Sequence, residues 1–181
     1  MMNEQISAEE TSQTTEYVCQ GYQILNVYQN MPPHLKQEVV QLWLESKVLS
    51  PAVAGQRADQ VLFTIRNPQG RLVGVNTVSL QNFLTEENPY YFMRLFIRRE
   101  DRGVLGLQFS ISKKAREFLE RYPHPQSNPK GMIIVAENRK YWRKGARRLL
   151  ARYHWHYFGQ GPKGNHIWYQ NFDGSKMTAL K

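Results

Sequence analysis

The residues best suited to chemistry lie between an apolar run, Tyr90–Ile97, and a segment with helical periodicity that begins near Leu107. The loop between them, Arg98–Gly106, reads RREDRGVLG and combines three arginines with two glycines. A helix N-terminus carries unpaired N–H groups and partial positive charge, and glycines before it let those groups approach phosphate oxygens. The loop therefore predicts a cradle for a phosphate-bearing ligand. The competing interpretation is that its Gly and Arg serve only turn geometry and solubility.

The distribution of charge predicts an anionic partner for the second half of the chain. Residues 1–90 hold five Lys+Arg and nine Asp+Glu, a net charge of −4, whereas residues 91–181 hold nineteen and six, a net charge of +13. Nucleic acid, an anionic membrane surface, a phosphorylated cofactor and an acidic protein all fit such a surface. A solvated helix face accounts for part of the same charge.

Length and composition indicate one folded domain, because 181 residues with 41% hydrophobic content suffice for a single core. We expect a disordered tail over 1–14, the domain over 15–173 and a loose tail over 174–181. No apolar run reaches the roughly 18–20 residues of a membrane span, and the polar start of the chain does not resemble a secretory signal. With one cysteine, Cys19, no intramolecular disulfide can form. The expected compartment is the cytoplasm, with no membrane partner.

The apolar periodicity predicts alternating strands and helices, and hence an α/β fold of the α+β type with a mixed central sheet flanked by helices. The expected strands are Tyr17–Tyr28, Val61–Arg66, Leu72–Leu80, Tyr90–Ile97, Met132–Ala136, His154–Gly159 and Asn165–Phe172. The expected helices run from Pro33 to about Val48, from Leu107 to near Tyr122, and from Asn138 to Tyr153.

The order of these elements and the Arg98–Gly106 loop resemble the GNAT N-acetyltransferase superfamily over about Tyr17–Phe172. In that family a loop of the form Arg/Gln-x-x-Gly-x-Gly/Ala holds the coenzyme A pyrophosphate, and the central strand pairs with the pantetheine arm. No register of this loop reproduces the whole motif: when Gly103 is the first glycine, Glu100 takes the leading position. The resemblance implies a mainly antiparallel sheet, and acetyl-CoA or another acyl-CoA as co-substrate. It implies that the binding residues are Leu95, Phe96, Ile97, Arg98, Arg102, Gly103, Val104, Leu105, Gly106 and Asn138.

A second stretch, after the expected strand Met132–Ala136, is similar to the same family. Members often show an Asn followed by a helix that ends Phe-Tyr-x-Lys-x-Gly-Phe. Here Asn138 stands in that place, and the helix ends LLARYHW over Leu149–Trp155. The family's Tyr, often the acid that protonates the leaving thiolate, aligns with Leu150. The usual acid is therefore missing from its usual position.

The resemblance implies acyl transfer, most simply acetyl transfer, to a small-molecule or peptide amine that attacks the thioester directly. Tyr153 or His154 is expected to replace the missing acid, unless both only close the helix. Glu100 is the predicted base that accepts the amine proton, with Asp101 and Glu137 as alternatives. Each of these carboxylates also suits a surface ion pair with the neighbouring arginines. The set expected to line the acceptor site, or else the core, is Tyr91, Met93 and Trp168.

The expected helix Asn138–Tyr153 supports a rival hypothesis. Its lysines and arginines spread over one broad face, and its other face should be core. The expected core positions are Tyr141, Trp142, Ala146, Leu149 and Tyr153. The alternative function is a non-catalytic binding module of the same fold that uses this basic face for nucleic acid or an acidic protein. Nucleic acid is the second choice of partner, and a homodimer remains open.

Histidines raise one further question. His154 and His156 would share one face of a strand, and His166 is near in sequence. That spacing is compatible with a metal ion, but no cysteine or carboxylate joins them at typical spacing, so we expect no metal site.

Overall fold

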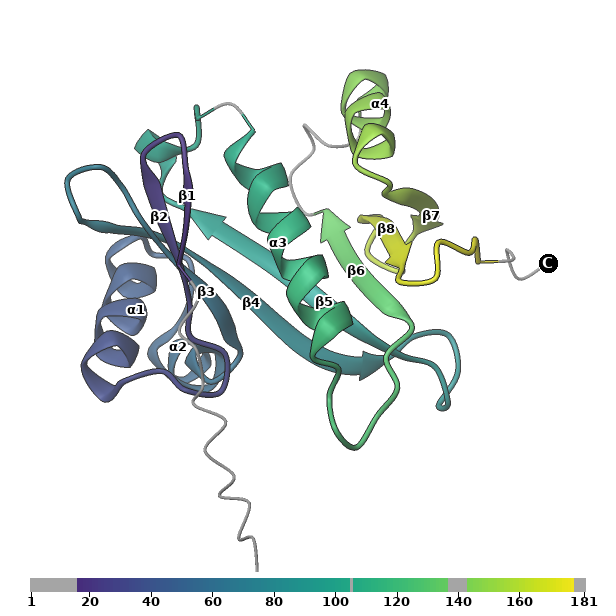
Figure 1. Cartoon of the computed structure of the whole chain (residues 1–181), viewed down its shortest axis with the longest axis horizontal. Coiled ribbons are helices and arrows are strands. Elements are labelled where there is room, and N and C mark those ends of the chain that lie inside the picture. Colours follow the sequence, from purple (N-terminus) through teal and green to yellow (C-terminus); the bar gives the residue numbers. More distant parts are fainter. Residues whose placement is uncertain (1–15, 105, 137–142, 178–181) are drawn as a thin grey trace, which may run out of the picture.

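A twisted sheet runs through the whole molecule, with helices on its faces (Figure 1). The computed structural model describes residues 16–104, 106–136 and 143–177. Their elements follow in the order β1 (Glu16–Cys19), β2 (Tyr22–Asn26), α1 (Pro33–Glu45), α2 (Pro51–Ala58), β3 (Val61–Arg66), β4 (Leu72–Asn82), β5 (Pro89–Ile97), the 3-10 turn η1 (Arg99–Asp101), α3 (Leu107–Arg121), β6 (Gly131–Ala136), α4 (Lys144–Arg152), β7 (His156–Gln160) and β8 (His166–Asn171).

The eight strands lie in the order β1-β2-β3-β4-β5-β6-β8-β7. Every neighbouring pair is antiparallel except β5 and β6, which are parallel. Short turns can join antiparallel strands, whereas parallel neighbours need a crossover, and α3 provides it here. The prediction of a mixed, mainly antiparallel sheet flanked by helices is confirmed.

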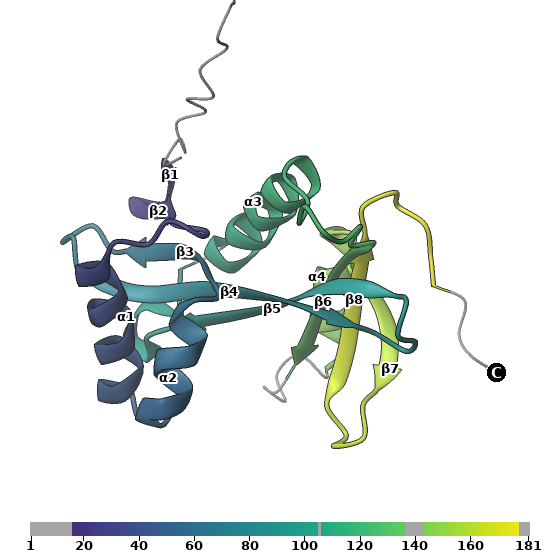
Figure 2. The ribbon, with the colours of Figure 1, turned by 90° about the horizontal axis from the view of Figure 1, so that it is seen from below.

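The helices bury the two faces of the sheet separately (Figure 2). On one face α1 and α2 cover β3 and β4, and Val39 and Trp43 of α1 join Val75 in a buried cluster. On the other face α3 packs Ile111 into a cluster with Met93 of β5. The apolar residues of α1 and α3 recur at three and four positions, which turns one stripe of each helix toward the sheet.

The predicted strand Tyr17–Tyr28 is wrong, because this stretch forms a hairpin of β1 and β2. The two residues of its turn, Gln20 and Gly21, have φ of 53° and 79°. Two consecutive residues with positive φ make the tight turn that matches the twist of antiparallel strands. The Gln-Gly pair carries the turn signal that the alternation of apolar residues obscures.

The first predicted helix also ends too late, and the helix after it was missed. Helix α1 ends at Glu45 rather than near Val48, and Pro51 begins α2 instead of only marking the end of a helix. Proline is well tolerated in the first turn of a helix, where its missing N–H has no intrahelical partner to lose. Ser50-Pro51 is therefore a helix start.

The predicted helix Asn138–Tyr153 lies partly outside the described residues, and its described part is α4. Two of its predicted core residues are exposed, Leu149 at 39% and Tyr153 at 38%. Leu150 and Trp155 are buried instead. Since α4 lies at the edge of the sheet, against β7, only a narrow stripe of the helix is covered. The core assignment of Leu149 and Tyr153 is thus wrong.

Gly131 provides a test of how tightly β6 and β8 pack. A Cβ on Gly131 would overlap the carbonyl oxygen of Gln170 and lie 2.8 Å from Cα of Asn171, both in backbone that cannot yield easily. We expect Gly131→Ala to lower the free energy of unfolding by about 3 kcal/mol, measured by urea denaturation. The control is Gly55→Ala in α2, where nothing lies within 4 Å of the added Cβ. It should raise stability by roughly 0.5–1 kcal/mol. Equal urea midpoints for the two variants would contradict the packing described here.

Candidate functional site

The central feature is the parting of the parallel strands β5 and β6. They pair at only two positions, Tyr91 with Met132 and Phe92 with Ile133. Beyond these positions β5 continues to Ile97 and β6 continues to Ala136, and the two strands diverge (Figure 1). Along this part of β5, no strand among the described residues pairs with the side that faces β6. Backbone polar groups that lose a strand neighbour need another partner, so the parting is a natural site for an extended ligand.

The first turns of α3 and the end of α4 meet beside this parting. The rings of Phe109 and Tyr153 stack with centroids 4.1 Å apart and an interplanar angle of 6°. The indole N–H of Trp155 donates to Oγ of Ser112 at 3.2 Å. These contacts hold the phenol of Tyr153 next to the N-terminus of α3. Sequence reasoning missed Phe109 and Ser112, because nothing local in α3 indicates a partner more than forty residues away.

Two of the three loop arginines, Arg98 and Arg102, make polar contacts with other parts of the protein. The guanidinium of Arg98 pairs with the carboxylate of Glu45 at the end of α1, at 2.7 Å. Nε of Arg102 donates to the carbonyl of Ile97 at 2.7 Å, and its guanidinium lies 5.9 Å from the ring centre of Phe96. Both side chains therefore brace the loop against β5 and α1. Within the described residues, neither Arg99 nor Arg102 has a carboxylate within 4 Å.

A buried carboxylate anchors the loop on its other side. Asp101 is 8% exposed and accepts a hydrogen bond of 2.8 Å from the hydroxyl of Tyr22 in β2. Burial of the phenol, together with this contact to Asp101, raises the pKa of Tyr22 above its ordinary value. The sequence suggested Asp101 as an alternative base. In the structure its carboxylate is buried and accepts the hydrogen bond from Tyr22 of β2.

The glycines of the loop leave room around the N-terminus of α3. Gly106 is the N-cap of α3 and has φ of 79°, a conformation that strains other residues. A Cβ added to Gly103 or Gly106 would have no atom within 4 Å. The predicted residues Leu105, Glu137 and Asn138 lie outside the described residues. Leu95 and Val104 are half-buried and pack against the core below the loop.

A hollow of about 240 Å³ brings four of the predicted residues together with the end of α1. Its lining consists of Glu45, Ser46, Val48, Phe96, Arg98, Arg99, Glu100 and Arg102. The side chain of Glu100 is 62% exposed, and its carboxylate lies 4.0 Å from Arg98. The contribution of α1 could not be read from the sequence, since its residues are about fifty positions from the loop.

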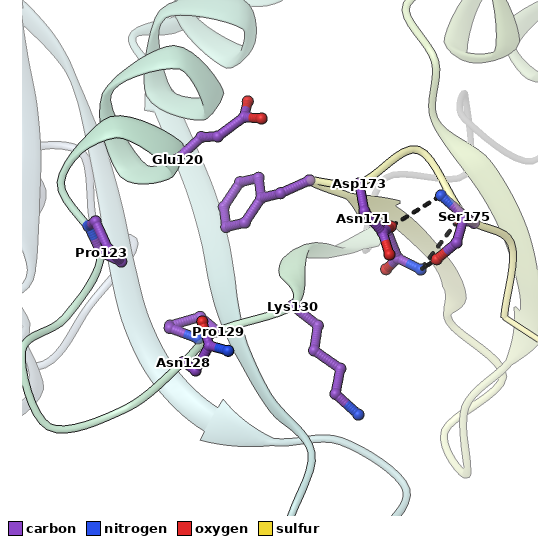
Figure 3. A pocket seen from close by; sticks show the side chains of 9 residues that line it. Glu120, Pro123, Asn128, Pro129, Lys130, Asn171, Asp173 and Ser175 are labelled. Atoms are coloured by element: carbon purple, nitrogen blue, oxygen red, sulfur yellow. Dashed lines mark hydrogen bonds between the residues drawn. The ribbon is translucent and has the colours of Figure 1, made fainter.

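A second hollow, of about 330 Å³, lies at the opposite end of β6 (Figure 3). Lys130 precedes β6, while Asn171 and Asp173 come from the end of β8 and the turn after it. Ser175 of that turn is held by the amide of Asn171 at 3.0 Å. Because β5 and β6 part at the other end of β6, this hollow is separate from the parting.

On the face of the sheet opposite α3, one row of side chains crosses the last paired position of β5 and β6. The strand registers place Ser79, Phe92, Ile133, Tyr169 and His156 side by side on this row. Burial, followed by the charges of nearby Lys176 and His154, lowers the pKa of His156 below 6.5. The row thus places aromatic side chains next to one another across the sheet, and the His156 imidazole, whose pKa is lowered, lies at one end. Tyr91, Met93 and Trp168 are buried in the core instead.

The proposed pairing of His154 and His156 on one face of a strand is wrong. His156 begins β7, whereas His154 precedes the strand in a left-handed conformation with φ of 63°. Among the described residues, no group of three or more His, Cys, Asp or Glu side chains is arranged to hold a metal ion.

The overall fold is similar to that of solved acetyltransferase structures. An acetyltransferase of the GNAT family from Listeria monocytogenes is 12% identical, with a TM-score of 0.58 over 87% of this chain and 99% of that one. A ribosomal-protein-S5-alanine acetyltransferase from Vibrio fischeri is 11% identical, with a TM-score of 0.60 over 90% of this chain and 100% of that one. A GCN5-related N-acetyltransferase from Kribbella flavida is 10% identical, with a TM-score of 0.56 over 83% and 98%.

The chain therefore has the GNAT fold, as the sequence predicted. No family model matches its sequence, and no curated protein matches it. Within the part of the chain that the structure describes, no helix has the length and apolar character needed to cross a bilayer.

A buried histidine beside the site makes stability depend on pH. His166, at the start of β8, is 4% exposed, and its Nε2 lies 3.2 Å from the side-chain nitrogen of Gln160. Burial, followed by the charge of Arg147 on α4, lowers its pKa below 6.5. As the pH falls to about 6.5, His166 therefore takes up a proton in the unfolded chain while it is still neutral in the folded chain. Stability is retained above this pH and is lost as the pH falls below it.

We expect the wild-type melting temperature to fall between pH 7.5 and pH 5.5, and to fall less in His166→Gln. His156 has a lowered pKa as well, so part of the slope should remain in this variant. The measurement is thermal unfolding at matched ionic strength. The control His34→Asn removes an exposed imidazole from α1 and should keep the wild-type slope. A wild-type slope in His166→Gln would contradict this assignment.

Proposed function

We propose that the chain is an acyl-CoA-dependent N-acyltransferase that uses acetyl-CoA as its donor and an amine as its acceptor. The observation that carries this proposal is the parting of β5 and β6 with the N-terminus of α3 and the phenol of Tyr153 beside it. The named acetyltransferases that share the fold support acyl transfer as the class of reaction.

The residues around the parting fit the donor in charge, shape and hydrogen bonding. The diphosphate would lie over Gly103 and Gly106, where the space is open, beside the cations of Arg99 and Arg102. The backbone of β5 from Leu95 to Ile97 offers groups that an extended amide chain can use. In this arrangement Arg98 acts indirectly: its ion pair with Glu45 fixes the start of the loop.

The donor supplies an activated acyl thioester, and the protein must position it and move two protons. An N–C bond forms as the C–S bond breaks, so the amine loses a proton and the thiolate gains one. We assign the proton donation to the Tyr153 hydroxyl, with His154 as the alternative, and the proton acceptance to Glu100. The amine approaches on the face that carries the row from Ser79 to His156.

Binding of the donor is tested by thermal unfolding with and without acetyl-CoA. A ligand at 100 times its Kd stabilises the folded state by about 2.7 kcal/mol, which for a chain of this size raises the melting temperature by roughly 5–10 °C. The double variant Arg102→Ala, Gly103→Val should lose this shift, because it removes a cation and fills the open space over the loop. The same variant should keep its near-UV circular dichroism.

The matched control changes the same residue types in α2, with Arg57→Ala and Gly55→Ala, and should keep the shift. No shift in the wild type at millimolar acetyl-CoA would overturn the proposed function. If the Arg102, Gly103 variant keeps the wild-type shift in melting temperature, the proposed function stands, but acetyl-CoA binds at another place on the chain.

The role of Tyr153 is tested by Tyr153→Phe, which keeps the ring stacked on Phe109 and removes only the hydroxyl. We expect kcat to fall by about 100-fold with the best acceptor from an amine screen, while the acetyl-CoA shift stays unchanged. Thiol release measures the rate. The companion variant His154→Asn tolerates positive φ and should keep most of the activity. The opposite ranking of the two variants would assign the acid to His154.

A further inference from the structure

We propose that the exposed face of α4 and the neighbouring surface of β7 bind the backbone of a single-stranded nucleic acid. This proposal concerns a surface that the acyl-transfer mechanism does not use. It is carried by the contrast between the clustered cations of α4 and the paired cations of α1 and α3.

The cations of α4 are exposed, and none has an acidic partner in the part of the chain that the structure describes. The set comprises Arg143, at the N-cap, and Lys144, Arg147, Arg148 and Arg152 within the helix. Among the described residues no ion pair involves any of them. The segment itself offers no carboxylate side chain, because no Asp or Glu occurs between Glu137 and Asp173.

Most cations on α1 and α3 are paired with carboxylates, whereas Arg57 of α2 and Arg121 of α3 have no ion pair among the described residues. On α3, Lys114 pairs with Glu117 at 2.9 Å, and on α1, Lys36 pairs with Asp59 across to the end of α2. In α4, by contrast, Arg143 and Arg147, Lys144 and Arg148, and Arg148 and Arg152 are like charges four positions apart. Such pairs destabilise a helix. The arrangement therefore opposes folding, and an anionic partner would remove the repulsion.

Two observations favour a nucleic acid strand over an acidic protein or a lipid surface. Four of the five cations are arginines, whose planar guanidinium matches phosphate oxygens in pairs. Tyr157 is 38% exposed on β7, and the guanidinium of Arg147 lies 4.4 Å from its ring centre. An exposed tyrosine beside arginines is the kind of platform on which unpaired bases stack.

The test measures fluorescence anisotropy of a labelled 20-nucleotide single-stranded RNA of mixed sequence, titrated with the full chain at 50–300 mM KCl. The test variant combines Arg143→Gln, Arg147→Gln and Arg148→Gln. The control removes three cations from α3 through Lys113→Gln, Lys114→Gln and Arg121→Gln, so both variants have the same net charge. We expect the α4 variant to bind at least tenfold more weakly at 100 mM KCl. Its salt dependence should fall by about two in log–log slope, since each phosphate contact contributes roughly 0.7. The control should stay within twofold of the wild type.

Several outcomes would overturn the proposal. They are wild-type affinity in the α4 variant, equal losses in the two variants, and no RNA binding by the wild type at 50 mM KCl. Competition by poly-glutamate at equal charge concentration as strong as by unlabelled RNA would indicate an acidic protein partner. Displacement of the RNA by acetyl-CoA at concentrations that saturate its thermal shift would assign the cations to the donor. The acetyl-CoA shift of the α4 variant is measured in parallel, so failure of the proposed function and failure of this proposal remain distinguishable.

Discussion

The parallel pairing of β5 and β6 is the constraint on which the other elements depend. A parallel neighbour needs a long crossover, and the crossover brings α3 over the face of the sheet with its N-terminus at the ends of these two strands. Because the pair keeps only two paired positions, the strands diverge just where α3 begins. The α4 segment then meets α3 through the ring stack of Phe109 and Tyr153 and the hydrogen bond from Trp155 to Ser112. The proposed ligand site depends on this geometry, since a parted sheet leaves backbone groups to be satisfied.

Long-range polar contacts hold the surroundings of the parting in place. The hydroxyl of Tyr22 reaches Asp101 across 79 positions of sequence, and that of Tyr90 reaches Asn171 across 81. Burial of the Tyr90 phenol, with smaller effects of Asp173 and Tyr169, raises its pKa to about 12, so this hydroxyl remains a hydrogen-bond donor at physiological pH. One contact ties the loop to the first hairpin, and the other ties β5 to β8 on the far side of β6. The parting therefore lies between two anchored halves of the sheet.

The arginines of the basic half have two different roles in the structure. Two of the three loop arginines, Arg98 and Arg102, contact the protein, and the hydrogen bond from Gln41 and the contact with Arg98 hold the pKa of Glu45 below its ordinary value. Those of α4 remain exposed and unpaired among the described residues. Glu45 of the acidic first half thus pairs with the loop, whereas the cations of α4 lie beside β7, the last strand of the sheet. The net charge of +9 does not by itself distinguish the paired arginines of the loop from the exposed ones of α4.

The sequence alone determined the strands and helices with strong periodicity, the mixed sheet, and the loop before α3, because these depend on local alternation and on residues close in the chain. It could not determine the β1–β2 hairpin or the start of α2, where turn chemistry at Gln20-Gly21 and Pro51 outweighs the apolar pattern. It also misplaced the buried face of α4, since burial there depends on how the helix lies against β7. Only the tertiary structure decided that Glu45 meets Arg98, that Tyr153 stacks on Phe109, and that β5 and β6 part. Each of these depends on segments far apart in the chain, whose approach is set by the packing of the whole sheet and leaves no local signal in the residues themselves.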